Sequence, residues 1–361
     1  MRILHVDTGR GWRGGQAQAL LLAKGLAARG HATFLLCPGG SPLAAACRGA
    51  GLDAGPSSGR GDLSPRLALD TARTVARFRP QILHVHTAHA LAPLLVARRF
   101  AVPGPVVSRR VSFPLRSGAV SRWKYGLARR IIAVSGAVAR GLAAAGVDPG
   151  RIRTIHSGYD PSRFEDLPSR DGARRSLGWL DDDLIFLFAG ALAPQKSIPV
   201  LFAAFRDLAA EPGGRRFRLV LAGDGPLRAR LEADAAAAGL AGAVTFLGHR
   251  DDVVRLMAAC DAVVLPSSEG EGSPAAVKEA MACGRAVVAV AGGGVEEIVE
   301  DGRTGLLVAP NDPVRLAGAL RLLAADRSLR DSLGAAGRVS VARYTADRMV
   351  EATEDVYREL V

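Results

Sequence analysis

Short apolar runs alternate with longer, alanine-rich stretches along the whole chain. A run of roughly four to eight apolar residues is typical of a strand buried on both faces of a sheet. The longer stretches, such as 16–29 and 67–78, are expected to be helices. This alternation predicts parallel sheets covered by helices. The expected strands are residues 3–7, 32–37, 82–86, 106–108, 131–134, 152–155, 184–189, 217–222, 244–247, 262–266, 286–290 and 305–308.

The pattern is interrupted by a polar stretch, residues 165–171, and then restarts. We therefore expect an α/β protein of two Rossmann-like domains, residues 1–165 and 172–340, that face each other across a cleft. The segment 341–361 carries a last helix, which is expected to cross back to the first domain. A chain of 361 residues, 48% of them apolar, is long enough to bury two cores.

Neither a membrane span nor a disulfide framework is expected. The sequence contains no run of 18 apolar residues, and its first seven residues are typical of a strand rather than a signal peptide. The four cysteines lack Cys-x-x-Cys spacing, so we expect reduced packing residues and no zinc site. These features predict a cytoplasmic protein.

Charge is distributed unevenly along the chain. Residues 1–170 carry 25 Lys/Arg and 8 Asp/Glu, a balance of +17, whereas residues 171–361 carry 22 and 27, a balance of −5. A basic first half predicts an anionic partner, such as a membrane surface, a phosphorylated glycolipid or nucleic acid. An arginine-rich surface without a specific partner is the alternative.

A glycine-rich loop, residues 9–15, follows the first expected strand. It contains Gly-x-Gly-x-x-Gly, but the end of the second strand, residues 36–38, lacks the acid that a dinucleotide site requires. We expect the amides of this loop to bind a phosphate or another anion, unless its glycines merely form the turn. The residues proposed for it are Arg13, Gly14, Gly15 and Gln16.

Histidines and arginines follow two other strands of the first half. His84, His86 and His89 resemble a metal-binding pattern, but no carboxylate lies nearby, so we expect no metal. His86 or His89 is instead expected to donate a hydrogen bond into the cleft. Arg109 and Arg110 end another strand, where a guanidinium can stabilise a leaving group or bind an acceptor phosphate; a solvated basic pair is the alternative.

Residues 116–130 interleave basic residues with Trp123, Tyr125 and Leu127. This composition is typical of a helix that lies on anionic lipid. We therefore expect a peripheral protein at the inner face of the cytoplasmic membrane. The charge also fits nucleic acid, but no nucleic-acid motif accompanies it, so no nucleic-acid partner is expected.

Two loops of the second half are candidates for binding a diphosphate. Gly190 begins a turn that leads to Lys196, whose ammonium is well placed to neutralise phosphate charge. In the next loop, Gly223-Asp224-Gly225, glycines permit close approach of the backbone to a ligand. The aspartates 181–183 precede a strand and are expected to form a solvated turn.

The most specific stretch is 266–284. Ser273 is expected to cap a helix that starts at Pro274, with Glu271 in the preceding loop and Glu279 inside the helix. A nucleoside diphosphate sugar across this terminus would place its diphosphate at free amides, its ribose near Glu279 and its sugar near Glu271. A capped surface helix with two solvated carboxylates is the alternative.

At these residues the chain resembles family 4 of the retaining glycosyltransferases, which have the GT-B fold. The resemblance covers essentially the whole chain, and its strongest element is the Glu-x7-Glu signature, Glu271 to Glu279. Further similar segments are Gly14-Gly15, Ile132-Ala133-Val134-Ser135, Gly158-Tyr159-Asp160, Gly223-Asp224-Gly225, Phe246-Leu247-Gly248 and Gly293-Gly294-Val295-Glu296-Glu297-Ile298-Val299.

The resemblance implies an acceptor site in the first domain and a metal-free nucleotide-sugar site in the second. In this scheme Lys196 contacts the diphosphate, Glu279 the ribose and Glu271 the transferred sugar. The other donor-site residues expected are the glycine loops, Gly272, Ser273, Pro274 and Ala275 at the helix start, and His249 and Arg250 near the base.

Three departures from the family concern leaving-group stabilisation. Ala191 stands where an arginine often follows the glycine, and Ser197 replaces a glycine after the lysine. Arg109 or Arg110 occurs where many members have a histidine.

Function is expected to be transfer of a sugar to a glycolipid, lipopolysaccharide-type or other cell-envelope acceptor. Two other functions remain open: a sugar-nucleotide epimerase of the same fold, and a non-enzymatic module that binds anions or nucleic acid.

Overall fold

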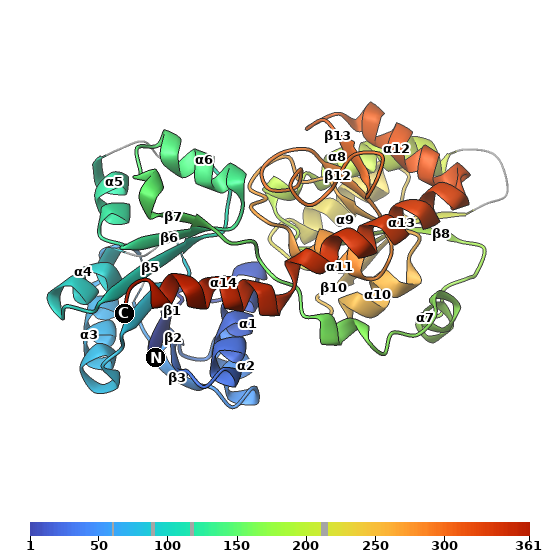
Figure 1. The fold of residues 1–361 in the computed structure, drawn as a ribbon. Coiled ribbons are helices and arrows are strands. Elements are labelled where there is room, and N and C mark those ends of the chain that lie inside the picture. Colours follow the sequence, from blue (N-terminus) through green and yellow to red (C-terminus); the bar gives the residue numbers. More distant parts are fainter. Residues whose placement is uncertain (60, 88–90, 116–118, 211–215) are drawn as a thin grey trace. The chain divides into compact units, whose positions relative to one another are not determined.

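The computed structural model describes residues 1–361 except 60, 88–90, 116–118 and 211–215. The chain divides into two compact units, Met1–Gly158 with Tyr344–Val361, and Tyr159–Arg343. The chain thus leaves the first unit at Gly158, several residues before the polar stretch 165–171 at which we expected the domains to divide. Figure 1 labels the elements of both units.

The first unit is built on a seven-stranded parallel sheet of order β3-β2-β1-β4-β5-β6-β7. Its strands are β1 (Arg2–Val6), β2 (Ala32–Pro38), β3 (Asp53–Ser57), β4 (Ile82–Val85), β5 (Gly104–Arg109), β6 (Arg130–Ala133) and β7 (Ile152–Thr154). Its helices are α1 (Gly14–Ala28), α2 (Pro42–Gly49), α3 (Pro65–Phe78), α4 (Leu91–Arg99), α5 (Ala119–Gly126), α6 (Gly136–Ala144) and α14 (Ala346–Arg358), with short 3-10 turns η1 (Pro149–Arg151) and, from Ala342 to Tyr344, η4.

Strand β3 is not among the strands expected from the sequence, because its residues, Asp-Ala-Gly-Pro-Ser, include almost no β-forming types. It lies at the edge of the sheet, where a proline costs no ladder hydrogen bond on its open side. Position in the sheet, rather than local propensity, therefore accounts for this strand.

The C-terminal helix α14 completes the core of the first unit. It lies beside α1 (Figure 1), and its residues Met349, Val350 and Tyr357 join a buried cluster with Leu22 and Leu26 of α1. Tyr357 is fully buried, and its hydroxyl lies 2.5 Å from Nδ1 of His84 in β4. The last helix is therefore anchored to the central sheet by a buried polar contact as well as by apolar packing.

The second unit contains a six-stranded parallel sheet of order β10-β9-β8-β11-β12-β13. Its strands are β8 (Leu184–Ala189), β9 (Phe217–Ala222), β10 (Val244–Gly248), β11 (Ala262–Leu265), β12 (Ala286–Val290) and β13 (Leu306–Val308). Its helices are α7 (Arg170–Leu177), α8 (Ile198–Ala209), α9 (Arg228–Ala237), α10 (Val253–Ala259), α11 (Ala275–Ala282), α12 (Pro313–Ala325) and α13 (Arg327–Val341), with 3-10 turns η2 (Pro161–Phe164) and η3 (Pro194–Lys196).

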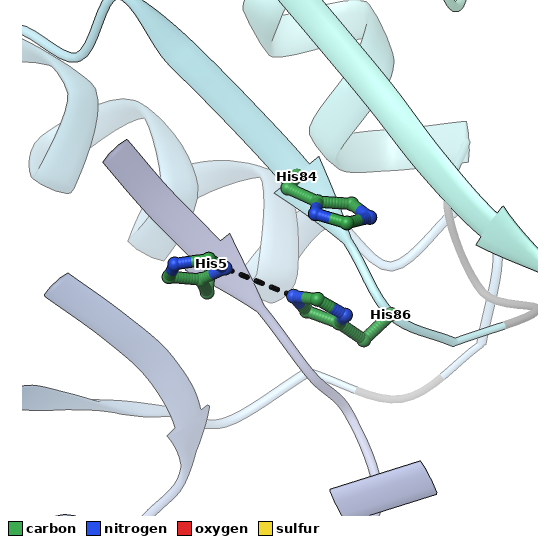
Figure 2. Close-up of side chains that lie close together, drawn as sticks. All are labelled: His5, His84 and His86. Atoms are coloured by element: carbon green, nitrogen blue, oxygen red, sulfur yellow. Dashed lines mark hydrogen bonds between the residues drawn. The ribbon is translucent and has the colours of Figure 1, made fainter. Parts of the chain in front are cut away.

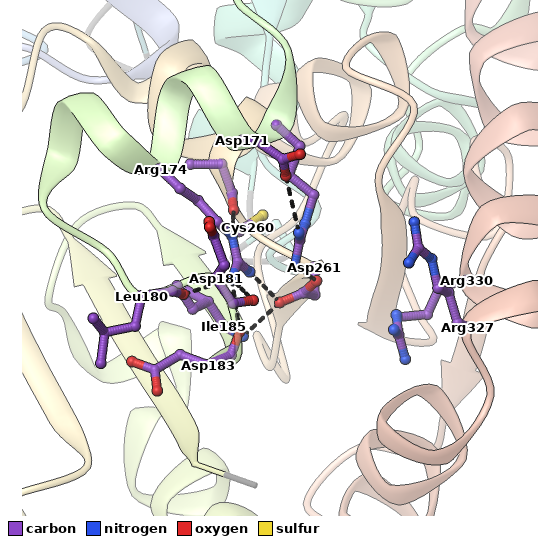
Figure 3. Close-up of polar contacts among 12 residues, drawn as sticks. Asp171, Arg174, Leu180, Asp181, Asp183, Ile185, Cys260, Asp261, Arg327 and Arg330 are labelled. Carbon is purple, nitrogen blue, oxygen red and sulfur yellow. Dashed lines mark hydrogen bonds and ion pairs between the residues drawn. The ribbon is translucent and has the colours of Figure 1, made fainter.

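A buried ion pair ties α7 to the amino-terminal ends of β8 and β11 (Figure 3). Arg174 is fully buried and lies 2.6 Å from Asp261, whose carboxylate also accepts the amide of Ile185. The same guanidinium donates to four backbone carbonyls, including that of Asp183. Asp183 itself is 4% exposed, so the expectation of a solvated aspartate turn is wrong for this residue. The backbone carbonyl of Asp183 accepts one of the hydrogen bonds that the buried Arg174 guanidinium donates.

Within the described part of the chain, no helix is both long and apolar enough to cross a membrane. All four cysteines are free, and Cys37, Cys47 and Cys260 are buried, as expected of packing residues.

Candidate functional site

The loops that follow β8 and β11 bring together two residues that lie far apart in the sequence. Lys196 closes η3 after β8, and its Nζ lies 2.5 Å from Oε1 of Glu271, which precedes α11. Both side chains are largely buried, at 19% and 13% exposure. Ser197 and Ser268 hold the same two loops together through their hydroxyls, 2.7 Å apart. The expected sugar-contacting carboxylate and the expected diphosphate-binding lysine are thus direct partners at the carboxyl ends of neighbouring strands.

Helix α11 begins one residue later than the sequence predicted. Its first helical residue is Ala275, and Pro274, with an extended backbone (ψ 120°), takes the capping position. Ser273 does not cap the helix, because its hydroxyl lies 2.6 Å from Nζ of the fully buried Lys278. No side chain caps the first turn of α11, which follows the buried Gly272. Its leading amides are therefore not used by a side-chain cap.

Glu279 lies on α11 and is paired with an arginine that the sequence did not point to. Nη1 of Arg163 is 2.7 Å from Oε1 of Glu279, and the glutamate side chain is 18% exposed. Burial raises the pKa of Glu279, while the nearby Arg163 charge acts in the opposite direction. The alternative of two solvated carboxylates is wrong, because Glu271 and Glu279 are both sheltered and both paired.

Arg163 and Lys278 are the two basic residues of this region that sequence reasoning missed. Lys278 shares a buried face of α11 with Met281 and Ala282, which lie three and four residues further on, and a lysine there must have a polar partner. Arg163 follows the Gly158-Tyr159-Asp160 segment, but nothing in its spacing identifies Glu279 as its partner.

The glycines of the loop after β9 allow this loop to lie against the loop after β8. Gly223 has φ +153°, and a Cβ atom there would lie 1.8 Å from the carbonyl oxygen of Gly190. A Cβ on Gly225 would lie 2.4 Å from the oxygen of Leu192. These glycines allow two neighbouring loops to touch each other, and their role in the approach of a ligand stays a prediction. Asp224 helps to hold the loops, since its carbonyl accepts the amide of Leu192.

His249 and Arg250 follow β10 on the surface. His249 lies 3.4 Å from Asp251 and its side chain is 60% exposed. Arg250 makes two hydrogen bonds, of 2.7 and 2.6 Å, to the carboxylate of Asp252. Both residues lie near the end of the strand, and Arg250 is engaged there by Asp252.

In the first unit, helix α1 begins at Gly14 directly after the glycine loop. Arg13 is exposed at the capping position, and no side chain caps the helix, which leaves the amides of Gly14 and Gly15 without a side-chain acceptor. Gln16 does not point away from the protein; its amide nitrogen lies 3.0 and 3.2 Å from the two carboxylate oxygens of Asp7. The loop therefore presents an uncapped helix terminus whose base is fixed by Gln16 and Asp7.

Three histidines lie together at the centre of the first sheet (Figure 2). His5 pairs with His84 in the register of β1 and β4, and Nδ1 of His5 lies 2.9 Å from Nε2 of His86. His84 is bound on both ring nitrogens, by Tyr357 and, at 2.7 Å, by Ser108. Burial lowers the pKa of all three, that of His5 to about 3. The cluster is therefore neutral at physiological pH.

The hydrogen bonds of this cluster have a fixed direction. Nη2 of Arg110 lies 3.2 Å from Nδ1 of His86, and because a guanidinium only donates, His86 carries its proton on Nε2 and donates to His5. One ring nitrogen from each histidine lies within 4.8 Å of the others, close enough to hold a metal ion. A metal would have to break these hydrogen bonds beside the Arg110 cation, so we assign none. The expectation that His86 donates outward is wrong, and His89 lies outside the described residues.

Arg109 and Arg110 differ in their surroundings. Arg109 donates to the carbonyl of Phe113 and to the hydroxyl of Tyr125, 3.3 Å away. Arg110 lies beside the start of α1, where a Cβ on Gly15 would be 3.7 Å from its Cδ. Burial lowers the pKa of Arg110 to about 10, which leaves it charged at neutral pH. Of the two arginines, Arg110 is the one next to the glycine loop.

Two protein families match this chain, one in each half. Residues 12–163 match the family described as Glycosyltransferase Family 4, and residues 169–340 match the family described as Glycosyl transferases group 1. The chain belongs to family 4 of the glycosyltransferases. Among curated relatives, the D-inositol 3-phosphate glycosyltransferase of Nocardioides sp. is 36% identical over 228 residues, 58% of this chain and 49% of the relative. This match thus spans about half the length of the relative.

Solved structures show that this family 4 chain has the GT-B fold. HepE of Anabaena, in complex with UDP and glucose, superposes with a TM-score of 0.89 over 100% of both chains at 21% identity. WaaG, a glycosyltransferase involved in lipopolysaccharide biosynthesis, gives a TM-score of 0.76 at 18% identity, covering 98% of this chain and 99% of WaaG.

One departure from the family has a structural consequence. Ser197, which replaces the usual glycine after the lysine, has φ +49° and ψ +36°, in the left-handed region that favours glycine. Its hydroxyl bonds to Ser268, so the strained residue supports the loop that carries Glu271.

The basic segment of this glycosyltransferase differs in part from the expected lipid-facing helix. In α5, Tyr125 is 3% exposed and packs in the core, and Lys124 lies 3.0 Å from Asp62. The expectation that Tyr125 faces lipid is therefore wrong. Arg122 and Trp123 are exposed, whereas residues 116–118 lie outside the described part of the chain.

Proposed function

We propose that this protein is a retaining glycosyltransferase that moves a sugar from a nucleotide-sugar donor to an acceptor hydroxyl. The observation that carries the proposal is the direct pairing of Lys196 with Glu271 ahead of the uncapped start of α11, with Glu279 farther along the same helix. A cation, free amides and two sheltered carboxylates provide groups for a diphosphate, a sugar and a ribose.

In this proposal, charge that builds on the departing diphosphate is the main demand on the protein. Lys196 and the first amides of α11 stabilise it, and Arg110 of the first unit is the candidate for the family histidine. Lys196 and Glu271 are partners in the structure. In this proposal the diphosphate binds Lys196, and the Glu271 carboxylate accepts hydrogen bonds from the sugar hydroxyls.

The acceptor hydroxyl attacks on the face from which the diphosphate leaves, and the leaving phosphate accepts its proton. No protein nucleophile and no metal takes part. Transfer activity that persists in EDTA would agree with a metal-free reaction, whereas loss that is restored by a divalent ion would contradict it.

The decisive test is Lys196→Ala, measured by transfer of labelled sugar from the donor. We expect most activity to be lost while the fold is retained, because one cation at a developing diphosphate charge typically contributes about two to three orders of magnitude in rate. Lys24→Ala, an exposed lysine on α1, is the matched control. Near-normal turnover of Lys196→Ala would end the assignment.

The names of similar proteins support a choice of donors and acceptors to try. HepE was solved with UDP and glucose, and the other proteins compared act on inositol 3-phosphate or in lipopolysaccharide biosynthesis. We propose a phosphorylated or lipid-linked glycan of the cell envelope as acceptor. Thermal-shift screening against UDP-, GDP- and ADP-sugars identifies the donor.

We also propose peripheral association with anionic membrane at the cytoplasmic face. The +17 balance of residues 1–170 and the exposed Arg122 and Trp123 support it. Flotation with vesicles that contain anionic lipid, compared with neutral vesicles, tests it; equal recovery would count against the proposal.

A further inference from the structure

The short segment that opens the second unit has a fixed shape. Asp160 caps the turn η2 by accepting the amide of Ser162 at 3.1 Å and its hydroxyl at 2.7 Å. The rings of Tyr159 and Phe164 pack edge to face, with centroids 5.5 Å apart, across the turn. Arg163 therefore projects from a braced turn rather than from a free loop.

The Arg163 guanidinium reaches from this turn to the helix that carries the Glu-x7-Glu signature. Its Nη1 lies 2.7 Å from Oε1 of Glu279. Among the hydrogen bonds of the described side chains, this is the only one made to that carboxylate, so Oε2 stays available to a ligand. The arginine is 43% exposed and the glutamate 18%, which places the charge of the pair at the edge of the solvent.

A sheltered carboxylate that binds a neutral diol needs help to stay ionised and in one rotamer. Burial favours its protonated form, and a protonated carboxyl is a weaker acceptor for hydroxyl groups. A guanidinium on one oxygen offsets the burial and fixes the orientation of the other oxygen. Arg163 makes this contact from outside α11, so it acts on Glu279 without disturbing the helix.

We infer that Arg163 is a positioning residue for donor recognition: it holds Glu279 through Oε1 so that Oε2 accepts the ribose hydroxyls of the nucleotide. The inference rests on the proposed function, since it assigns a partner to the ribose-binding acid of that site. It predicts that Arg163 sets affinity for the ribose without contacting the nucleotide.

Several other ionisable groups lie near Glu279 and must be considered when the pH dependence of nucleotide binding is measured. Lys278 shares α11 with it, and Cys283 follows that helix at its C-cap. The charges of Arg285 and of Arg338 in α13 act on the Cys283 thiol. Burial raises the pKa of Cys283 to about 12, so the thiol stays neutral across the useful range. Glu279 is the acid of this contact, and burial raises its pKa.

The experiment compares two probes on the full chain by calorimetry. One is whichever of UDP, GDP and ADP gives the largest thermal shift, and the other is its 2′,3′-dideoxy analogue. The proteins are wild type, Arg163→Met, Arg163→Lys and Glu279→Gln, with Arg303→Met as control. Arg303 is exposed and forms a surface pair with Glu300, 2.8 Å apart, in the same unit.

We expect Arg163→Met to weaken binding of the ribose probe by roughly ten- to hundredfold and to leave binding of the dideoxy probe almost unchanged. Arg163→Lys should restore part of the loss. In wild type, affinity should fall as the pH drops through the raised pKa of Glu279, and in Arg163→Met that fall should begin at higher pH. Glu279→Gln should lack this pH dependence.

Several outcomes would overturn the inference while the proposed function stands. One is that Arg163→Met discriminates between the two probes as well as wild type does, and another is that its affinity has the same pH profile as that of wild type. A third is tighter binding of the ribose probe by Arg163→Met, which would mean that Arg163 competes with the ribose. If wild type itself fails to prefer the ribose probe, or Glu279→Gln keeps the preference, the donor assignment fails instead. Circular dichroism and the Arg163→Lys variant separate loss of fold from loss of positioning.

Discussion

Each unit buries a polar cluster in its sheet, but the two clusters lie at opposite ends of their strands. In the second unit, Arg174 and Asp261 join the amino-terminal ends of β8 and β11 (Figure 3). In the first unit, His84 and His86 lie at the carboxyl end of β4 (Figure 2), and Arg110 follows β5. Ligands of parallel α/β sheets bind beyond the carboxyl ends of the strands.

The two clusters differ in how much hydrogen-bonding capacity their buried arginine keeps. The Arg174 guanidinium is saturated by backbone carbonyls and one carboxylate, so it has no hydrogen-bonding capacity left for a ligand. Arg110 has an acceptor in His86, but its Nε has no hydrogen-bond partner among the described residues. We therefore expect the Arg174 cluster of the second unit to serve stability and the histidine cluster of the first unit to serve positioning. The following measurements test that division.

The largest difference between the units should appear in acid. The lowered pKa values of His5, His84 and His86 mean that the unfolded chain binds more protons than the folded one below about pH 6.5. Their stabilising contribution is present above that pH and is lost as the pH falls. Three such groups remove up to about 4 kcal/mol per pH unit from the stability of the first unit.

Hydrogen exchange followed by mass spectrometry at pH 7.5 and 5.5 measures this effect unit by unit. The second unit has a single histidine, the exposed His249, and should keep its protection over this range. Simultaneous opening of both units would contradict the assignment of acid sensitivity to the histidine cluster.

Replacing Arg174 should have the next largest effect. Arg174→Met leaves Asp261 buried without its main partner, which typically costs about 3–5 kcal/mol. Arg175→Met alters an exposed arginine on the same helix and should change stability by less than about 0.5 kcal/mol. Denaturant unfolding measures both. A small effect of Arg174→Met would mean that the ion pair is replaceable by apolar packing.

Tyr357→Phe tests the contact between the last helix and the histidine cluster. Loss of the hydroxyl leaves Nδ1 of the buried His84 unpaired, for an expected loss of about 1–3 kcal/mol. Tyr159→Phe, whose hydroxyl makes no hydrogen bond recorded among the described residues, is the control. Equal effects of the two substitutions would remove the special role of the Tyr357 hydroxyl.

The smallest effect is expected at Ser197. Ser197→Gly relieves a left-handed backbone that costs a non-glycine residue about 1 kcal/mol, but it removes the hydrogen bond to Ser268, so the net change in stability should be under about 1 kcal/mol. Ser197→Ala keeps the strain and loses the bond, and should be less stable than Ser197→Gly. The reverse order in thermal unfolding would show that the hydroxyl outweighs the strain.

Local pattern was sufficient for most strands but not for the partners of charged residues. The strands at 184–189, 217–222 and 286–290 coincide with β8, β9 and β12, because buried parallel strands are short continuous apolar runs. By contrast, Arg163 lies 116 residues before Glu279, and no spacing rule connects them. The start of α11 was misplaced by one residue because the partner of Ser273, Lys278, is visible only in three dimensions.

The histidine cluster shows where sequence reasoning stopped short. His84 and His86 were recognised as neighbours on one strand, but His5 joins them only through the register of β1 against β4. That register pairs His5 with His84 side by side. Knowledge of the strand order would have been enough to predict that His5 joins the cluster. The direction of the hydrogen bonds among the histidines could be assigned only from the position of Arg110.

The place of α14 has a consequence for synthesis of the protein on the ribosome. Because Met349, Val350 and Tyr357 belong to the core that also contains Ile3, Leu22 and Ile82, the first unit cannot finish packing until the last residues have been made. The second unit, Tyr159–Arg343, is already complete at that moment. The half of the chain that is translated first is thus the half that matures last, and until then its open side exposes apolar surface that a chaperone can recognise.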